Sequence, residues 1–293
     1  MTTRHVVVVG DVMLDVVVRP KAPLAPTSDT PSSIRVSRGG SGANVAIAIQ
    51  ASGHEVRYIG AAGRDAACDV FLDSLHESDV MTQLELVDVP TGTVVSLVGG
   101  DGQRMMLSDR GANVRLDEAF VAERLEEPFD HLHVSGYLLL DDSTRTLAEH
   151  ALLKAQQRGR STSIDACSVA PLREVTPDVF LRAASFASQL FANEEEALVL
   201  TSTSDPLDAL DVLSRLFDEV VVTLGENGAI GARGPARYAA NALPVGVFDT
   251  TGAGDAATGA YIGARLRDES PHRSLELAME AAAAVLGGLG ARG

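Results

Sequence analysis

Short apolar runs rich in β-branched residues, each followed by a segment with helical character, decide the fold class of this chain. The first run is four consecutive valines at residues 6–9, followed by Gly10 and Asp11. A strand that is apolar on both faces suits the centre of a parallel sheet that helices cover on both sides. Further strands are predicted at residues 56–60, 131–135, 161–165, 186–191 and 220–224, and helices at residues 43–49, 65–77, 143–158, 194–200 and 206–217.

This alternation predicts a three-layer α/β/α sandwich with a mostly parallel central sheet. A chain of 293 residues can bury a sizeable core. We expect a single domain over residues 1–293.

One region departs from the alternation. Residues 91–98 and 104–108 are rich in strand-forming residues and flank a Gly-Gly-Asp-Gly turn at residues 99–102, which is the pattern of a hairpin. Together with residues 33–37 they predict a small second sheet. We expect the segments near 12–38 and 91–110 to form a β lid over a ligand site. An edge hairpin without function is the alternative.

The chain is acidic, with 40 acidic and 24 basic residues and a formal net charge of −16 at pH 7. Proteins that coat nucleic acid or an anionic membrane need a basic surface, so we expect neither partner. No stretch of about 18 apolar residues, the length that spans a bilayer, occurs in the sequence. The two cysteines, Cys68 and Cys167, are expected to be reduced, buried thiols. These features predict a soluble, cytoplasmic protein.

A glycine-rich turn at residues 249–260 opens a helix that we expect to run to Arg267. The first amides of a helix have no partner within the helix, and the helix dipole makes their surroundings positive. Because their side chains are small or absent, Gly252, Ala253 and Gly254 would let an anion approach these amides. Asp255 then has two interpretations: a carboxylate that caps the helix, or a general base beside the anion hole.

Four segments, taken in order, resemble the signatures of the ribokinase-like (PfkB) carbohydrate kinases. Residues 39–46 (Gly-Gly-Ser-Gly-Ala-Asn-Val-Ala) are similar to the N-terminal signature, and residues 60–65 follow at the expected distance. Residues 193–196 resemble the Asn-x-x-Glu motif, residues 223–228 the nucleotide-binding strand and turn, and residues 249–255 the C-terminal signature. The resemblance extends over nearly the whole chain.

The resemblance implies a phosphotransferase that uses ATP and Mg²⁺ to phosphorylate a hydroxyl of a sugar or a similar acceptor. It makes Asp255 the general base and gives the transferring phosphoryl group an anion hole at Gly252, Ala253 and Gly254. Glu196 would act near Mg²⁺ through water, although a solvated helix face is the simpler interpretation of this residue. The nucleotide would be bound by Asn193, Thr223, Gly225 and Gly228.

For the acceptor, the resemblance implies binding by Asp15 and Asn44, with Gly39 and Gly40 allowing close approach. We expect Asp15 to follow the first strand, at the carboxyl end where open α/β sheets bind ligands. Ser41 stands where ribokinases usually have a lysine, and residues 134–137 are followed by no carboxylate until Asp141, so ribose itself is not favoured. Arg110 is interpreted as a surface arginine, with an anionic group of the acceptor as the alternative partner.

Relatives of this kind often bind a monovalent cation, and here a K⁺ site would use Asp249, Thr251, Val285, Gly288 and Gly290. His131 and His133 show no metal-ligand spacing with a third residue and are expected to pack in the core. A homodimer through the lid is also implied.

Two other functions stay open. One is a nucleoside kinase of the same fold, although residues 91–113 contain no Phe, Tyr or Trp that would stack on a base. The other is a nucleotide-binding sensor without catalysis, which is disfavoured because both Asp255 and the anion hole are present.

Overall fold

The computed structural model describes residues 3–99, 104–246 and 251–287. Its larger sheet has nine strands in the order β13-β12-β11-β10-β9-β8-β1-β4-β5, and a second sheet has four in the order β3-β2-β6-β7. The strands are β1 (His5–Val9), β2 (Met13–Pro20), β3 (Ser32–Gly39), β4 (Glu55–Gly63), β5 (Met81–Val87), β6 (Gly92–Val98), β7 (Arg104–Asp109), β8 (His131–Val134), β9 (Ser161–Asp165), β10 (Gln189–Asn193), β11 (Glu219–Thr223), β12 (Ala229–Arg233) and β13 (Ala236–Ala240). The helices are α1 (Ser41–Ala51), α2 (Ala66–Glu77), α3 (Glu118–Arg124), α4 (Asp142–Gln157), α5 (Val169–Val175), α6 (Pro177–Ala183), α7 (Glu194–Thr201), α8 (Pro206–Leu213), α9 (Ala253–Leu266) and α10 (Pro271–Leu286).

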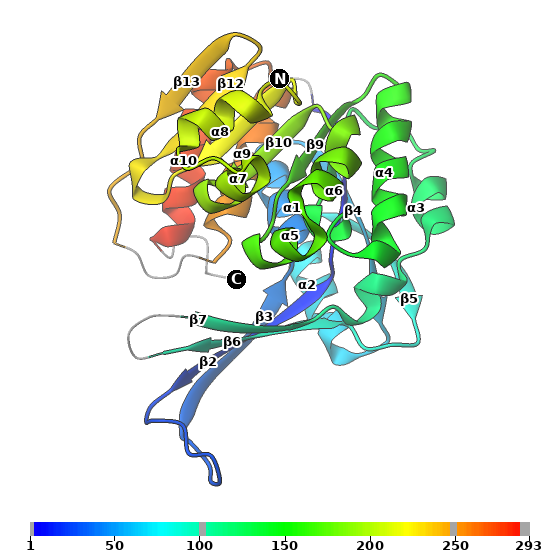
Figure 1. The fold of residues 1–293 in the computed structure, drawn as a ribbon. Helices are drawn as coiled ribbons and strands as arrows, with labels where there is room; N and C mark the ends of the chain where they lie inside the picture. Colours follow the sequence, from blue (N-terminus) through cyan, green and yellow to red (C-terminus); the bar gives the residue numbers. More distant parts are fainter. Residues whose placement is uncertain (1–2, 100–103, 247–250, 288–293) are drawn as a thin grey trace.

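The valine run forms β1 near the centre of the larger sheet, as predicted. Strands β5, β4, β1, β8, β9, β10 and β11 are mutually parallel, whereas β12 and β13 are antiparallel additions at one edge. Alternate valines of β1 serve two different cores. Val6 and Val8 pack on the side of α1, α2, α9 and α10, and Val7 and Val9 pack on the side of α3 to α8. The three-layer sandwich is therefore confirmed (Figure 1).

The second sheet projects from the carboxyl edge of the larger one (Figure 1). The predicted hairpin is confirmed, since β6 and β7 pair antiparallel, and the segment near residues 33–37 is a strand of the same sheet. Sequence reasoning missed β2, which pairs with both β3 and β6. The tip of the hairpin, residues 100–103, lies outside the described residues.

Several predicted boundaries were wrong, two of them for the same reason. The strand predicted at residues 186–191 begins at Gln189, because residues 184–186 form a 3₁₀ turn that extends α6. The helix predicted at residues 206–217 ends at Leu213, where Ser214 caps it. In both cases apolar residues continue beyond the element, before the start of β10 and after the end of α8, and the pattern alone therefore misplaces the boundary.

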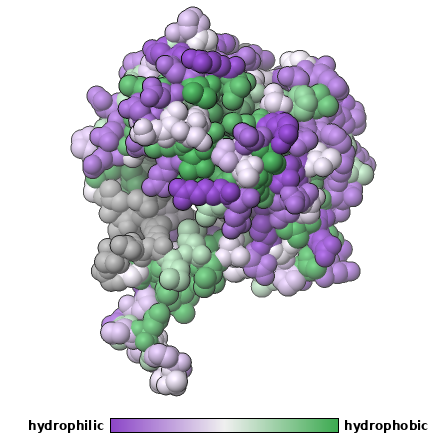
Figure 2. Space-filling model, viewed as in Figure 1, coloured by the Kyte–Doolittle hydropathy of each residue, from purple (hydrophilic) through white to green (hydrophobic). Residues whose placement is uncertain are grey.

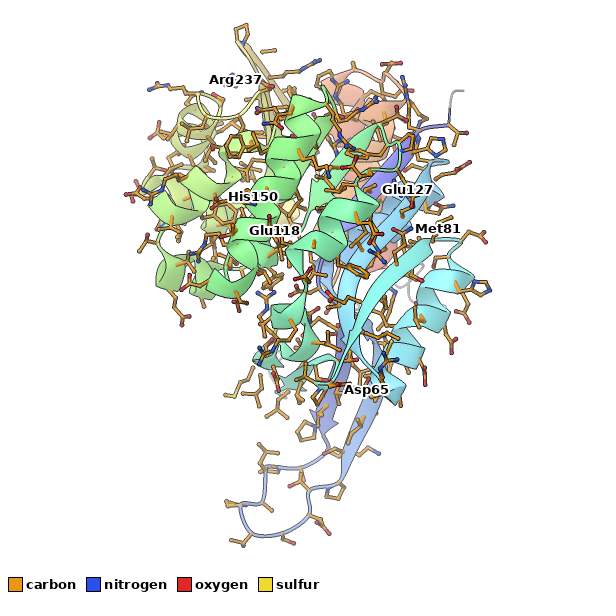
Figure 3. All side chains as sticks on the ribbon, turned by 90° about the vertical axis from the view of Figure 1, so that its right-hand side faces the viewer. Asp65, Met81, Glu118, Glu127, His150 and Arg237 are labelled. Carbon is orange, nitrogen blue, oxygen red and sulfur yellow. The ribbon has the colours of Figure 1, made fainter. Side chains whose placement is uncertain are left out.

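Asp65 fixes the start of β6 against α2. Its carboxylate caps α2 by accepting the Cys68 amide, and it also accepts the amide and the hydroxyl of Thr91 at 2.8 and 2.7 Å. Figure 3 shows Asp65 at the end of the larger sheet from which the second sheet projects. This single side chain therefore helps to set the angle of the second sheet. None of the helices in residues 3–99, 104–246 and 251–287 has the length and apolar character needed to cross a membrane.

Candidate active site

The candidate site lies where the order of the parallel strands reverses. After β1, the chain first adds β4 and β5 on one side of this strand. It then returns to the other side of β1 and adds β8, β9, β10 and β11 in turn. Open α/β sheets bind ligands at the carboxyl edge near such a switch point. Polar residues end the strands at this edge: Asp11 follows β1, and Asp165, Asn193 and Thr223 end β9, β10 and β11.

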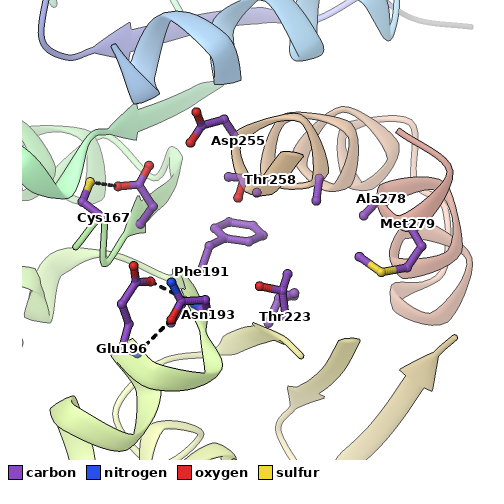
Figure 4. Close-up of a pocket in the computed structure, with 14 residues that line it drawn as sticks. Cys167, Phe191, Asn193, Glu196, Thr223, Asp255, Thr258, Ala278 and Met279 are labelled. Carbon is purple, nitrogen blue, oxygen red and sulfur yellow. Dashed lines mark hydrogen bonds between the residues drawn. The ribbon is translucent and has the colours of Figure 1, made fainter. Parts of the chain in front are cut away.

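A pocket of about 150 Å³ opens at this edge, between the ends of β9, β10 and β11 and the helices α9 and α10. Five residues that the sequence assigned to the site line it: Asn193, Glu196, Thr223, Gly254 and Asp255. Figure 4 shows Asp255 and Glu196 on opposite sides of the pocket, with the ring of Phe191 between them. Ala278 and Met279 of α10 close the far side.

Asn193 and Glu196 form a reciprocal cap at the start of α7. The Asn193 side-chain oxygen accepts the Glu196 amide, and Glu196 Oε2 accepts the Asn193 amide, both at 2.9 Å. The alternative interpretation of Glu196, a solvated helix face, is excluded because the residue is only 6% exposed. Burial raises the pKa of Glu196 to about 7, against the hydrogen bond from the Asn193 amide. A cation bound near this carboxylate would favour its ionised form.

The start of α9 is open to the pocket. Gly252 precedes the helix in the left-handed region, with φ of 78°, and the first helical hydrogen bond runs from the Ala256 amide to the Gly252 carbonyl. The amides of residues 253–255 come before that bond and have no partner within the helix. A Cβ added to Gly254 would meet nothing within 4 Å, so this face of the first turn is free for a ligand.

Asp255 does not cap its own helix. Its Oδ1 accepts the Ser41 hydroxyl and its Oδ2 accepts the Asn44 amide group, both at 2.7 Å. Burial raises the pKa of Asp255 to about 6, opposed by the hydrogen bonds from Asn44 and Ser41 and assisted by the negative charge of Asp165. Of the two interpretations of Asp255, the helix cap is therefore wrong.

Gly39 and Gly40 are glycines because two acidic residues come too close for a side chain. A Cβ on Gly39 would overlap the Asp15 carboxylate, and a Cβ on Gly40 would overlap the Asp11 carbonyl. Gly40 also has a φ of 96°, which disfavours other residues. Asp15 follows the first strand, as expected, and lies within β2. Burial raises its pKa to about 6; the nearby Arg38 charge opposes this shift and the Asp255 charge adds to it.

Two arginines have roles that the sequence did not indicate. Arg38 donates to the Asn44 side-chain oxygen and so orients the amide that binds Asp255. Arg110 is not a surface arginine: it pairs with the buried Asp11 at 2.8 Å and donates to the Tyr137 carbonyl at 2.6 Å. Its position directly after β7 ties the second sheet to the end of β1. The sequence around Arg110 does not indicate these contacts, because Tyr137 is 27 positions away and Asp11 is 99 positions away.

Several predicted site residues lie elsewhere. Gly225 and Gly228 are not among the residues that line the pocket, and Gly228 is required by the tight turn, since a Cβ there would overlap the Ala240 carbonyl. Asp249, Gly288 and Gly290 lie outside the described residues, while Thr251 precedes α9 and Val285 lies in the last turn of α10. Within the described part of the chain, no group of three or more His, Cys, Asp or Glu side chains could hold a metal.

Comparison with known proteins places the chain in a family. A family model described as pfkB family carbohydrate kinase matches residues 3–293. An ATP-dependent ribose-1-phosphate kinase from Halopiger xanaduensis is 29% identical over 91% of this chain and 87% of its own length.

Two solved structures share the fold. Adenosine kinase from Sinorhizobium meliloti has a TM-score of 0.88 at 24% identity, covering 98% of this chain and 94% of its own. An Escherichia coli protein described as a ribokinase II, solved with ATP and Mg²⁺, has a TM-score of 0.87 at 20% identity, covering 98% and 93%. With the family model matching almost every residue, the chain belongs to the pfkB family of carbohydrate kinases and is a phosphotransferase with an alcohol acceptor.

Proposed function

We propose that this kinase transfers the γ-phosphoryl group of ATP to a hydroxyl of a sugar or sugar-like acceptor, with Mg²⁺ as the metal. The observation that carries the proposal is the position of Asp255, a carboxylate at the first turn of α9 beside amides that have no helical partner. A base and an anion-binding site are thereby next to each other. Phosphoryl transfer to an alcohol needs both of them.

Asp255 would accept the proton of the acceptor hydroxyl. Its pKa of about 6 suits this role, because the group is mostly ionised near neutral pH and is still a stronger base than an ordinary aspartate. The amides of Gly252, Ala253 and Gly254 would stabilise the negative charge that spreads over the phosphoryl oxygens. These amide donors are already in place before the reaction, so no free energy is lost in reorienting them.

The pocket residues fit ATP and Mg²⁺ by the chemistry of their donors. Carboxylate, amide and hydroxyl oxygens from Glu196, Asn193 and Thr223 are the hard donors that Mg²⁺ and its water shell prefer. Glu196 would act through water, since one of its oxygens already holds the Asn193 amide. Gly225 and Gly228 would border the nucleotide at the following turn. Bound Mg²⁺ would supply positive charge beside these oxygens.

Asp15, Gly39, Gly40 and Asn44 would bind the acceptor. Asp15 lies on the second sheet, and its pKa responds to both Arg38 and Asp255, so its carboxylate lies near the base. A carboxylate accepts the paired hydrogen bonds of a vicinal diol. The second sheet would then cover the acceptor as a lid, within a single kinase domain.

A screen of acceptors tests the proposal. Release of ADP from Mg·ATP is measured with pentoses, hexoses, keto-sugar acids, sugar phosphates and nucleosides, using wild type and Asp255→Asn. We expect one class to give release that depends on Asp255. A wild-type protein that releases no ADP above background with any of them would contradict the proposal.

A nucleoside kinase is the second candidate, and it is favoured by the similarity to the adenosine kinase structure. The absence of aromatic residues from residues 91–113 favours a bare sugar. The nucleoside arm of the same screen separates the two.

A K⁺ site near the anion hole is a further part of this proposal. Thr251 and Val285 would contribute to it, together with Asp249, Gly288 and Gly290. Equal turnover in buffers containing only Na⁺ or only K⁺ would contradict it.

A homodimer through the second sheet is proposed from the composition of one of its faces. Two neighbouring rows across all four strands are aliphatic: Ile34, Val18, Leu97 and Met105 form one, and Val36, Val16, Val95 and Leu107 form the next. Ile34 and Leu107, at opposite edges of the sheet, are 62% and 59% exposed. Figure 2 shows the apolar colouring of this projecting sheet. An exposed apolar surface of this kind is typical of an interface, and we propose a cytoplasmic dimer.

A further inference from the structure

A second carboxylate lies close to the candidate base, and one hydroxyl joins the two. Ser41 Oγ is 2.7 Å from Asp255 Oδ1 and 3.3 Å from Asp165 Oδ2. A serine hydroxyl has a single proton, so it donates to only one of these carboxylates at a time. The family signatures do not include Asp165, and sequence reasoning treated it only as the end of a strand.

Asp165 is held as a carboxylate by the donors around it. Its Oδ1 accepts the Gly136 amide at 2.9 Å and the Cys167 thiol, and its Oδ2 lies 3.3 Å from His133 Nε2. Burial alone would raise the pKa of Asp165, but the hydrogen bonds from His133, Cys167 and Gly136 hold it below the ordinary value. Asp165 therefore stays an acceptor beside Ser41.

Behind Asp165, a chain of buried polar side chains runs along β8 and β9 toward the other end of the sheet. His133 Nδ1 and His131 Nε2 both contact Ser163 Oγ, at 2.9 and 2.8 Å, and His131 Nδ1 contacts Ser161 Oγ at 2.8 Å. Burial lowers the pKa of His131 to about 3, so this ring is neutral. Because the ionised Asp165 can only accept, the chain ends with His133 Nε2–H donating to Asp165. The two histidines are buried in the core, as expected, and in addition they form this chain of polar contacts.

We propose that Asp165, oriented by His133, is a positioning residue for the base and acts through Ser41. This inference rests on the proposed function, in which Asp255 accepts the proton of the acceptor. While Asp255 is ionised, the Ser41 hydroxyl donates to it and holds it toward the acceptor. Once Asp255 is protonated, its new O–H donates to Ser41 Oγ, and the Ser41 proton turns to Asp165.

The proton balance of this exchange is simple. The O–H bond of the acceptor breaks as its oxygen bonds to the γ-phosphorus, and an O–H bond forms on Asp255. The bond from that phosphorus to the bridging oxygen breaks at the same time, and ADP leaves with its electron pair. At Ser41 no covalent bond breaks, because its hydroxyl only rotates from one carboxylate to the other. Asp255 loses its proton to water when the product leaves. Asp165 stays ionised throughout.

Asp165 and Ser41 shift the pKa of Asp255 in opposite directions. The charge of Asp165 raises the pKa of Asp255, and the hydrogen bond from Ser41 lowers it. Other groups also face Asp255 or Asp165 from neighbouring elements. They are Asp15 of β2, Arg38 of β3, Tyr58 of β4, His133 of β8, Asn44 of α1, Glu196 of α7, Asp11 after β1 and Tyr137 after β8. Asp165→Asn also removes a negative charge that raises the pKa of Asp11 and of Glu196, whereas Ser41→Ala removes no charge.

The test compares Ser41→Ala, Asp165→Asn and the double variant in kcat and in the acid limb of kcat against pH. We expect each single variant to lose roughly tenfold in kcat, the contribution of one hydrogen bond to a charged group. The acid limb should move to lower pH in Asp165→Asn and to higher pH in Ser41→Ala, by roughly one unit. The double variant should lose no more kcat than either single variant, because both break the same connection.

Controls separate this role from a structural one. Ser41→Thr keeps the hydroxyl and should retain kcat within about twofold of wild type, and Asp73→Asn, an exposed change on α2, should alter neither quantity. Losses that multiply in the double variant, or an acid limb that stays in place, would overturn the proposal. If Asp165→Asn does not fold, two other measurements test the proposal. They are the shift of the acid limb in the kcat–pH profile of Ser41→Ala and the kcat that Ser41→Thr retains.

A measurement without substrate distinguishes this inference from the proposed function. The carboxyl carbon of Asp255 is titrated by ¹³C NMR in wild type and in both single variants, with Asp255→Asn to assign the signal. An inactive wild type contradicts the proposed function whatever the titration shows. An active wild type whose Asp255 titration is unmoved by both changes contradicts only the coupling through Ser41.

Discussion

Gly39 leaves the space that the carboxylate of Asp15 occupies. A Cβ on Gly39 would lie 2.8 Å from Asp15 Oδ2 and closer still to Oδ1. The two residues lie on neighbouring strands, where Gly39 pairs with Met13 and Asp15 pairs with Ser37. The glycine of the N-terminal signature therefore sets the direction in which an acidic side chain of the second sheet points.

Gly39→Ala should weaken acceptor binding without affecting the nucleotide. The added methyl group would push the Asp15 carboxylate out of its present position, and the acceptor KM should rise roughly tenfold, the value of one misplaced hydrogen bond to a charged group. The KM for ATP should stay within about twofold. Gly246→Ala, where a Cβ would meet nothing within 4 Å, is the matched control. An unchanged acceptor KM in Gly39→Ala would refute the role of Asp15.

Asp255→Asn should abolish transfer and keep nucleotide binding. An amide cannot take up the acceptor proton, so kcat should fall by about 10²–10⁴. The Kd of ATP, measured by calorimetry, should change by less than about threefold. In wild type, kcat should decline as the pH falls below about 6, where Asp255 becomes protonated. Wild-type turnover by the Asn variant would exclude Asp255 as the base.

The same substitution should stabilise the fold at neutral pH. The pKa of Asp255 rises from 3.8 to about 6 on folding, so the native state holds its proton more tightly than the unfolded chain. The resulting stabilisation is fully present below pH 3.8 and is lost as the pH rises through about 6. Asp255→Asn leaves no carboxyl to ionise at this position, so the variant does not lose this stabilisation as the pH rises. Its free energy of unfolding in urea should exceed that of wild type at pH 7.5, and the difference should shrink by pH 4.5. A less stable variant at pH 7.5 would contradict the raised pKa.

The sequence predicted those parts of the fold that depend on local pattern. The valine run, the alternation of elements and the hairpin of β6 and β7 follow from side-chain periodicity and turn residues, which act over a few positions. Missing β2 had a physical reason: residues 13–20 alternate little, since most of them are half-buried on both faces of a sheet that lies outside the main core.

The candidate site was predicted where residues belong to a compact motif. Asp255, Asn193 and Glu196 lie in such motifs, and the structure brings all three to one pocket. Asp165, Arg38 and Arg110 were missed because their roles depend on partners from distant segments. The contact between Ser41 and Asp165, for example, joins residues that are 124 positions apart. Only the packing of α1 against the sheet creates it.

Arg110→Ala should destabilise the protein. Asp11 is 4% exposed, and burial already raises the pKa of this carboxyl against the opposing charge of Arg110. Removing the arginine leaves a buried carboxylate without its counter-charge, which costs about 3–5 kcal/mol. Adding Asp11→Asn to Arg110→Ala should recover part of this loss, because the buried group is then neutral. Urea denaturation measures all three proteins, and a loss below about 1 kcal/mol in Arg110→Ala would show that the pair lies in effectively solvated surroundings.

Ile34→Asp should dissociate the proposed dimer. The residue lies at one edge of the aliphatic rows on the second sheet, and a charge there would be buried without a partner in any interface formed by this face. Arg35→Asp is the matched control, since successive residues of a strand point to opposite faces and Arg35 is also exposed. Light scattering after size exclusion should give twice the chain mass for wild type and for Arg35→Asp, and the chain mass for Ile34→Asp. Equal masses for wild type and Ile34→Asp would show that the aliphatic face does not hold two copies together. A dimer disrupted by both changes would place the interface at the edge of β3 instead.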